Sequence, residues 1–361
     1  MKRRKFLKGA AAGGVAAAAA TVAAPAISQG IKQLKMVTTW PKNFPGLGTG
    51  AERLAKRIGT MSDGKLQVKV YGAGELVPAF QSFDAVSSGK AEMSHSVSYY
   101  WQGKAPAFNF FASVPYGFTA MEHAAWMLWG GGLEMWTELC DQFNVVPFMR
   151  ASTGVQMGGW YRKEMNSLDD FNGLKFRMPG LGGEVLRSLG ATVVNLPGGE
   201  ISAALQAGTI DGTEWVGPWH DLAFGFYKVA KFYYWPGLHE PCTTGEVLVN
   251  KTVWSGLSKQ HQEIIRVAVQ AEAIIEHAEF QYKSADALAV LLIQHGVQLR
   301  NFSDEMLKGF GKAALEVVAQ VGNKDPFTKK VYDSFMAQRK KAIGWSALGE
   351  QAYFNARSLN V

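Results

Sequence analysis

Arg177 is the residue around which the sequence suggests a binding site. It lies near the end of a strand-like run at 173–178, and Pro179 and glycines at 180, 182 and 183 follow it. An arginine keeps its charge at biological pH and presents a planar fork of donors that matches a carboxylate, while glycines let the backbone approach a ligand. Spacing alone does not decide the role, because an arginine at a strand end is more often a surface or ion-paired group. Its companions in the chain carry the argument.

Oxygen ligands occur at three further places near predicted strands. Gln156 lies in the glycine-rich stretch 153–161, where glycines usually mark a bulge or a close backbone approach. Its side chain could offer a carbonyl oxygen to a cation or an amide to a carboxylate. Glu214 and Trp215 close a predicted strand that stops at a Gly-Pro pair, and Glu240 follows in a later loop. Solvent exposure or surface pairing is the alternative for both glutamates.

Aromatic residues follow another strand end. Tyr99, Tyr100 and Trp101 come just after a predicted strand at 91–96. Ligands of open α/β sheets sit outside the carboxyl ends of strands, so these rings could border a ligand. Packing in the core is the equal alternative, because aromatic side chains bury much surface.

The usual sequence motifs of catalysis and nucleotide binding are missing from the chain. The sequence has no GxSxG elbow, P-loop, HExxH or CxxC motif, which argues against nucleophilic, nucleotide and redox chemistry. We interpret none of the histidines at 95, 123, 220 and 239 as a metal ligand or a base. Cys140 and Cys242 fit no metal or redox spacing; one disulfide between them is possible, but unpaired or merely structural thiols are expected.

Residues 1–28 read as an export signal. Arg3-Arg4-Lys5-Phe6-Leu7-Lys8 is a twin-arginine pattern, followed by a weakly apolar Ala/Gly/Val run that makes a poor membrane span. We expect this signal to be removed and the protein to reach the periplasm. Without its five basic residues, the 37 basic residues become 32 against 30 acidic ones. The positive net charge therefore indicates no nucleic-acid partner.

Strands and helices alternate through about 330 residues after the signal, which predicts an α/β protein of more than one domain. The stretch 257–295 contains neither glycine nor proline, so it predicts one helix long enough to span two lobes. A coiled-coil partner helix is the alternative. Residues 344–361 form a predicted C-terminal helix whose apolar side chains, Trp345, Leu348, Tyr353 and Phe354, could cover a second protomer.

Several long motifs together resemble one family. They are Gly-Glu-Leu-Val-Pro at 74–78, Gly-Val-Gln-Met-Gly-Gly-Trp at 154–160, Lys-Phe-Arg-Met at 175–178 and Asp-Gly-Thr-Glu-Trp-Val-Gly-Pro at 211–218. With the twin-arginine signal and the long helix, the chain is similar to the periplasmic solute-binding receptors of TRAP transporters (DctP type). It is most similar to the branch that binds 2-oxo acids and 2-hydroxy acids, such as pyruvate or lactate, with a metal ion.

The resemblance implies a two-lobed periplasmic binding protein fold, with lobes joined by crossing strands and a long spine helix. Lobe I would comprise 29–150 and about 240–257, and lobe II 151–239 and about 270–343, with 258–295 as the spine. A homodimer through the C-terminal helix and delivery to a membrane permease are further expectations.

The resemblance also assigns roles to residues. Arg177 would bind the ligand carboxylate, Gln156 the ligand and the metal, and Tyr100 would close the pocket from lobe I. Glu214, Glu240 and the backbone carbonyl of Trp215 would bind the cation, Na⁺ or Ca²⁺, with Trp215 also beside the ligand. Hard cations prefer such oxygen ligands. The loop 238–245 departs from the aromatic and glycine-rich sequence of pyruvate-type receptors, so the size of the ligand and the identity of the metal stay open.

The sequence thus predicts a non-enzymatic receptor that captures a small 2-oxo or 2-hydroxy monocarboxylate with a cation. One alternative is an exported metal-dependent enzyme, because carboxylates beside a metal can activate water. Another is a receptor that holds the acid through Arg177 without a metal.

Overall fold

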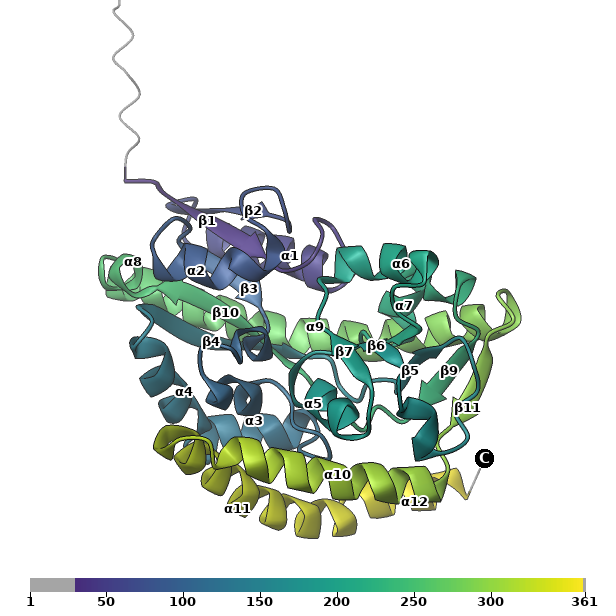
Figure 1. Ribbon diagram of the computed structural model, residues 1–361. Helices are drawn as coiled ribbons and strands as arrows, with labels where there is room; N and C mark the ends of the chain where they lie inside the picture. Colours follow the sequence, from purple (N-terminus) through teal and green to yellow (C-terminus); the bar gives the residue numbers. More distant parts are fainter. Residues whose placement is uncertain (1–29, 360–361) are drawn as a thin grey trace, which may run out of the picture.

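The computed structural model describes residues 30–359, so the export signal expected at 1–28 lies outside the described residues. Two mixed sheets form the centres of two lobes, and helices cover them (Figure 1). This is the two-lobed α/β architecture that the sequence predicts. Among the described helices, none combines the length and the apolar character needed to cross a membrane.

Lobe I is built on a five-stranded sheet with the order β2-β1-β3-β10-β4. β1 pairs in parallel with β2 and β3, whereas β10 runs antiparallel to β3 and β4. Ala51, Leu54 and Ile58 repeat at helical spacing and bury one face of α1 against this sheet. The elements of the lobe are β1 (Lys32–Thr38), α1 (Leu47–Met61), β2 (Leu66–Tyr71), α2 (Ser82–Ser87), β3 (Met93–Ser96), α3 (Ala120–Trp129), α4 (Gly132–Asp141), β4 (Val145–Ser152), β10 (Thr244–Asn250) and α8 (Lys251–Ser255).

Lobe II is built on a six-stranded sheet with the order β11-β9-β5-β8-β6-β7. β6 lies parallel to β7 and β8, and β5 lies antiparallel to β8 and β9. Its elements are β5 (Gly159–Tyr161), β6 (Lys175–Arg177), α5 (Gly180–Ser188), β7 (Thr192–Val194), α6 (Gly198–Ala207), β8 (Gly212–Thr213), α7 (Pro218–Phe224), β9 (Phe232–Trp235) and β11 (Gln298–Asn301). The parallel strands bring the ends of β6 and β8 to one edge of the sheet.

The chain passes between the lobes at 153–158, after β4, and again at 236–243, before β10. The two crossing segments are hydrogen-bonded to each other, with Thr153 N donating to Thr243 O at 3.0 Å and Gly237 N donating to Gln156 O at 2.8 Å. We expected a glycine-rich strand over 153–161, but only Gly159–Tyr161 joins the sheet. Thr153 and Gln156 pair with the other crossing segment instead, which places Gln156 between the lobes.

Helix α9 (Lys259–Ile293) runs across both lobes (Figure 1). The Ser258 side chain accepts a hydrogen bond from His261 N and caps its start. Ile265 and Ala268 pack in the core of lobe I, while Phe280 and Leu291 pack in that of lobe II. The long predicted helix is therefore a single element, and it packs against this chain's own lobes.

The C-terminal helices depart from the expected division. α10 (Asp304–Gly322) packs on α5, in lobe II. α11 (Pro326–Leu348) falls mostly in the range 270–343 that we assigned to lobe II, yet its Phe335 ring lies 4.3 Å from that of Phe118 and 5.2 Å from that of Trp126, both in lobe I. The chain thus returns to lobe I because α11 buries its apolar stripe there. α11 also continues to Leu348, so the final helix, α12 (Glu350–Ser358), begins later than expected.

Candidate ligand and metal site

The crossing segments bring Gln156 and Glu240 together. Gln156 N donates to Glu240 O at 3.3 Å, and the Gln156 side chain donates through Nε2 to Glu240 Oε2 at 2.9 Å and to Thr243 Oγ1 at 3.0 Å. The Thr243 hydroxyl also donates to Glu240 Oε2. Gln156 Oε1 is buried and has no hydrogen-bond partner among residues 30–359. A buried carbonyl oxygen of this kind needs a donor or a cation.

Parallel pairing of β6 and β8 brings Arg177 and Glu214 together. Arg177 lies opposite Thr213 in the register, so Glu214 is the next residue past the strand end. Both side chains are 1% exposed, and Arg177 Nη1 donates to Glu214 Oε1. Arg177 Nε donates to Leu196 O at 3.1 Å, and the guanidinium lies 5.0 Å from the centre of the Trp215 ring. Its buried Nη2 has no partner within the described chain, so one edge of the fork is available.

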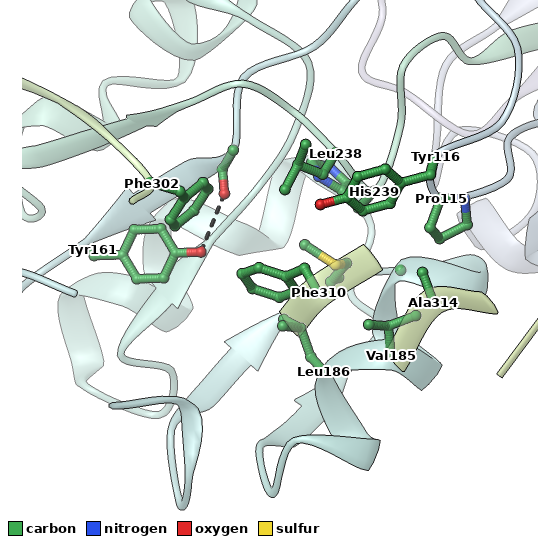
Figure 2. Close-up of a pocket in the computed structure, with 13 residues that line it drawn as sticks. Pro115, Tyr116, Tyr161, Val185, Leu186, Leu238, His239, Phe302, Phe310 and Ala314 are labelled. Atoms are coloured by element: carbon green, nitrogen blue, oxygen red, sulfur yellow. Dashed lines mark hydrogen bonds between the residues drawn. The ribbon is translucent and has the colours of Figure 1, made fainter. Parts of the chain in front are cut away.

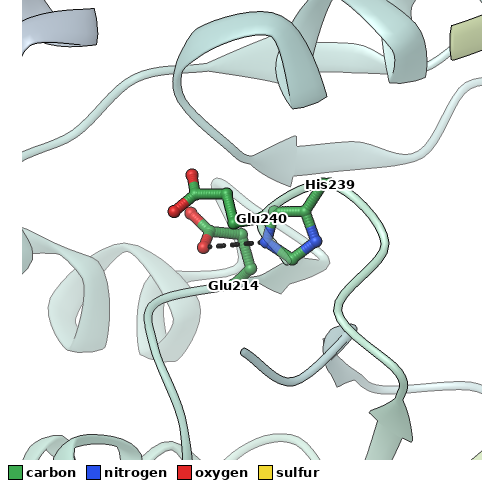
Figure 3. A group of neighbouring side chains, drawn as sticks. All are labelled: Glu214, His239 and Glu240. Carbon is green, nitrogen blue, oxygen red and sulfur yellow. Dashed lines mark hydrogen bonds and ion pairs between the residues drawn. The ribbon is translucent and has the colours of Figure 1, made fainter. Parts of the chain in front are cut away.

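His239 joins this group, contrary to our interpretation of the sequence. Its Nε2 lies 3.2 Å from Glu214 Oε2, and one potential ligand atom from each of Glu214, His239 and Glu240 lies within 4.8 Å of the other two (Figure 3). All three residues are buried. The sequence offered one signal, which was that His239 directly precedes Glu240 in the crossing segment.

Burial sets the protonation of the cluster. Burial raises the pKa of Glu214 to about 7, although the Arg177 charge and hydrogen bond act in the opposite direction. Burial, with the nearby charge of Glu214, raises the pKa of Glu240 to about 7. The pKa of His239 falls to about 4 through burial, so its ring is neutral at physiological pH. A bound cation would favour both carboxylates in their charged form, and the donor set of Gln156, Glu214 and Glu240 fits a hard cation.

Tyr100 faces the cluster from lobe I. It lies in a short 3₁₀ helix, Ser98–Trp101, directly after β3. Burial raises the pKa of its hydroxyl to about 12, and the charges of Arg177, Glu214 and Glu240 also act on it. The structure therefore brings Tyr100 together with Gln156, Arg177, Glu214, Trp215 and Glu240, and their roles stay predictions. Trp101 instead packs in the core of lobe I and donates to Glu246.

A cavity of about 20 Å³ lies between the lobes, about the space that one water molecule needs. Arg150 lines it and was missed by the sequence analysis. Its side chain is 1% exposed and forms an ion pair with Glu276 of α9, which is fully buried. Arg150 and Arg177 thus each pair with a buried carboxylate, and Arg177 is distinguished by its position beside both Glu214 and Glu240.

A second cavity, of about 30 Å³, lies behind His239 (Figure 2). Apolar side chains dominate its lining, among them Met178, Leu186, Leu238 and Phe302, and His239 forms part of its wall. His239 thus stands between the polar cluster and an apolar space.

Both cysteines are buried free thiols, as expected for unpaired cysteines, and burial raises the thiol pKa of each.

Comparison with known proteins finds solute-binding proteins as relatives. The monocarboxylate 2-oxoacid-binding periplasmic protein of Nostoc sp. is 40% identical over 324 residues, 90% of this chain and 88% of that protein. A TRAP transporter solute-binding protein of Bordetella bronchiseptica, described as a mixed-occupancy dimer with copurified calcium and picolinate, has a TM-score of 0.89 at 35% identity over 91% of this chain and 98% of its own. A counterpart from Pseudoalteromonas atlantica, with bound sodium and pyruvate, has a TM-score of 0.87 at 37% identity, covering 90% and 99%.

These relatives are transport receptors, so the alternative of an exported enzyme gains no support. The model of the family described as bacterial extracellular solute-binding protein, family 7 (DctP), matches residues 36–325. The chain therefore belongs to the DctP family of bacterial extracellular solute-binding proteins.

Proposed function

We propose that this protein is the solute receptor of a TRAP transporter and captures a small 2-oxo or 2-hydroxy monocarboxylate together with a cation. One observation carries the proposal: the buried guanidinium of Arg177 lies beside two buried carboxylates, Glu214 and Glu240, at the junction of the lobes. The named ligands of the relatives, 2-oxo acids and pyruvate, fit this chemistry. The ligand supplies one negative charge, which the free edge of Arg177 would take.

The cation site would use Glu214, Glu240, Gln156 Oε1 and the backbone carbonyl of Trp215. A bound ion would neutralise the two carboxylates and would supply a positive charge for the 2-oxygen of the ligand. The Bordetella relative holds calcium with picolinate, and the Pseudoalteromonas relative holds sodium with pyruvate. The alternative of a receptor without metal leaves Gln156 Oε1 unsatisfied in a buried place.

The two lobes supply opposite walls of the site. Tyr100 comes from lobe I and Arg177 from lobe II, and the paired crossing segments lie between them. Hinge closure around the ligand would bury it between these residues. We also propose export by the twin-arginine signal at 1–28, work in the periplasm and delivery to the membrane permease.

A homodimer through the C-terminal helices is part of the proposal. α12 has no buried residue, and the Tyr353 and Phe354 side chains are exposed, as are Trp345 and Leu348 at the end of α11. Contiguous exposed aromatic and aliphatic side chains favour a protein partner. The Bordetella relative is described as a dimer.

The test is a thermal-shift panel on protein that has been unfolded in chelator and refolded to remove ligand and metal. The panel holds 2-oxo acids, 2-hydroxy acids, dicarboxylates and amino acids, each with and without Ca²⁺ or Na⁺. A ligand at a hundredfold excess over its dissociation constant stabilises the native state by about 2.7 kcal/mol, a shift of a few degrees. We expect shifts only for monocarboxylates with a 2-oxygen, and larger shifts with the cation. Equal shifts with dicarboxylates or amino acids would contradict the assignment.

A further inference from the structure

We infer that His239 is a nitrogen ligand of the cation site, and that this receptor therefore prefers a divalent transition-metal ion to sodium or calcium. The inference rests on the proposed function and concerns the same site. It adds a residue that the resemblance does not assign and changes the class of cation. Three features of His239 support the inference: its distance to the carboxylates, the packing that holds it in place, and the chemistry of imidazole.

The first feature is distance. Nitrogen and oxygen ligands lie about 2.0–2.1 Å from a small divalent ion, so two ligands of one ion are about 3.0 Å apart at a right angle and about 3.4 Å apart in a tetrahedron. His239 Nε2 and Glu214 Oε2 are 3.2 Å apart, between these values. Glu240 offers an oxygen within 4.8 Å of both. The three atoms can therefore share one ion without a large movement.

The second feature is packing. A methyl group on Gly182, in the first turn of α5, would lie 2.8 Å from His239 Cβ and 2.8 Å from the sulfur of Met178. Helix α5 therefore lies directly against His239, and only a glycine fits there. On the chain side, Leu238 O accepts a hydrogen bond from Tyr116 N at 3.0 Å, which ties the segment to lobe I. His239 is thus held in place by elements of both lobes.

The third feature is the donor set around the ring. A neutral imidazole carries its proton on one nitrogen, and the other is a lone-pair donor. If the proton is on Nδ1, Nε2 and the Glu214 carboxylate present two lone pairs to each other, and a cation between them resolves the contact. Gln156 Oε1, buried and unpartnered, is an independent sign that the cluster is built for a cation. Imidazole nitrogen suits zinc, nickel and iron, whereas purely oxygen sites suit sodium, calcium and magnesium.

The competing interpretation is that Nε2 carries the proton and donates to Glu214. His239 would then be a positioning residue, and the site would keep the preference of an oxygen-only site. The two interpretations differ in whether nitrogen touches the ion, which spectroscopy measures directly.

The experiment uses the full exported chain, stripped of metal by unfolding and refolding in chelator, with pyruvate as the added carboxylate. Binding of Mn²⁺, Zn²⁺ and Ca²⁺ is measured by calorimetry for the wild type, for His239→Gln and for His295→Gln. His295 is a matched control, because its ring stacks on Tyr227 outside the cluster. Electron spin-echo spectroscopy of the Mn²⁺-loaded protein reports a directly bound ¹⁴N.

We expect the wild type to bind Zn²⁺ more tightly than Ca²⁺ and, when loaded with Mn²⁺, to show the ¹⁴N coupling. His239→Gln should lose the coupling and at least about tenfold in Zn²⁺ affinity, the scale seen when residues around a metal are replaced. Its Ca²⁺ affinity should change less than its Zn²⁺ affinity, and His295→Gln should match the wild type. If His239→Gln does not refold, the wild-type ¹⁴N coupling decides.

Absence of ¹⁴N coupling in the wild type, or equal loss of Ca²⁺ and Zn²⁺ affinity in His239→Gln, would overturn the inference. In either case pyruvate would still bind with Ca²⁺, and the proposed function would stand. If pyruvate binds with none of the three cations, the proposed function itself fails.

Discussion

Removal of the cation should weaken carboxylate binding through the charges of the buried site. With a monocarboxylate bound, Glu214, Glu240 and the ligand present three negative charges against the single positive charge of Arg177. Two unit charges 4 Å apart interact by about 4 kcal/mol at an effective dielectric constant of about 20. Even half of one such repulsion weakens binding more than tenfold, since about 1.4 kcal/mol corresponds to a factor of ten. Half of that repulsion is about 2 kcal/mol, so we expect the dissociation constant for pyruvate to rise about 30-fold in chelator at pH 8.

The affinity for pyruvate should change with pH in opposite directions in the absence and in the presence of the cation. Burial raises the pKa of both Glu214 and Glu240 to about 7, so below pH 7 protons neutralise these carboxylates. Without a cation, pyruvate should bind better as the pH falls from 8 to 6. With a limiting cation, binding should weaken over the same range, because protons compete with the ion for the carboxylates.

The stability of the cation-free protein should also depend on pH through Glu214 and Glu240. A buried carboxyl group whose folded-state pKa is raised stabilises the fold below its ordinary pKa, and that contribution is lost as the pH rises through the folded value. The melting temperature of the cation-free protein should therefore fall between about pH 5 and pH 7.5 and recover on addition of the ion.

Calorimetry at pH 6 and pH 8, with chelator or with cation, measures these effects. Glu240→Gln removes one negative charge from the site and should reduce the difference between the two conditions. Glu164→Gln is the control, because this exposed glutamate pairs with Arg300 at the surface. The reasoning fails if chelator leaves the dissociation constant unchanged at pH 8, or if both conditions show the same pH trend.

Three further predictions concern other parts of the molecule. Arg177→Ala should weaken pyruvate binding by at least about 2 kcal/mol because a charge-assisted partner is lost, and Arg177→Lys should restore little of it; near-wild-type affinity by calorimetry contradicts the anchor role. Glu276→Gln should lower the free energy of unfolding by about 3–5 kcal/mol because Arg150 is left as a buried unpaired charge. The double variant Arg150→Met with Glu276→Met should recover most of that stability in urea titrations, and a Glu276→Gln protein as stable as the wild type refutes the prediction. Trp345→Ser with Leu348→Ser should shift the protein toward monomer in analytical ultracentrifugation with unchanged pyruvate affinity, and an unaltered dimer rejects the helix interface.

Local patterns predicted most of the fold. Strand and helix alternation gave the two α/β lobes, and the absence of proline and internal glycine gave α9. The stretch at 153–158 failed as a strand because the backbone of Thr153 and Gln156 pairs with the other crossing segment, 236–243, which lies about 80 residues later. α11 was placed in the wrong lobe for a similar reason, since amphipathic spacing shows that a face is buried and not which surface covers it.

The site could be predicted only in part. Arg177 carried a local signal, because a guanidinium at a strand end before glycines is a pattern of chemistry and spacing. Arg150 and His239 carried none of that strength. Arg150 is partnered by Glu276, which lies 126 residues away, and His239 meets Glu214, 25 residues earlier in the chain, only once the crossing segment is folded against the end of β8. Long-range pairing of this kind is not visible in one sequence.

The position of β10 has a consequence for folding during synthesis. This strand lies between β3 and β4 in the sheet of lobe I, yet it follows β3 by 147 residues in the chain, from 97 to 243. At 5–20 residues per second, a ribosome needs roughly 7–30 s to make that stretch. During this time β3 and β4 lack their shared neighbour, and their open edges can pair with other chains. The nascent chain should therefore depend on chaperones until residue 250 has emerged, and lobe I cannot be produced as an independent N-terminal fragment.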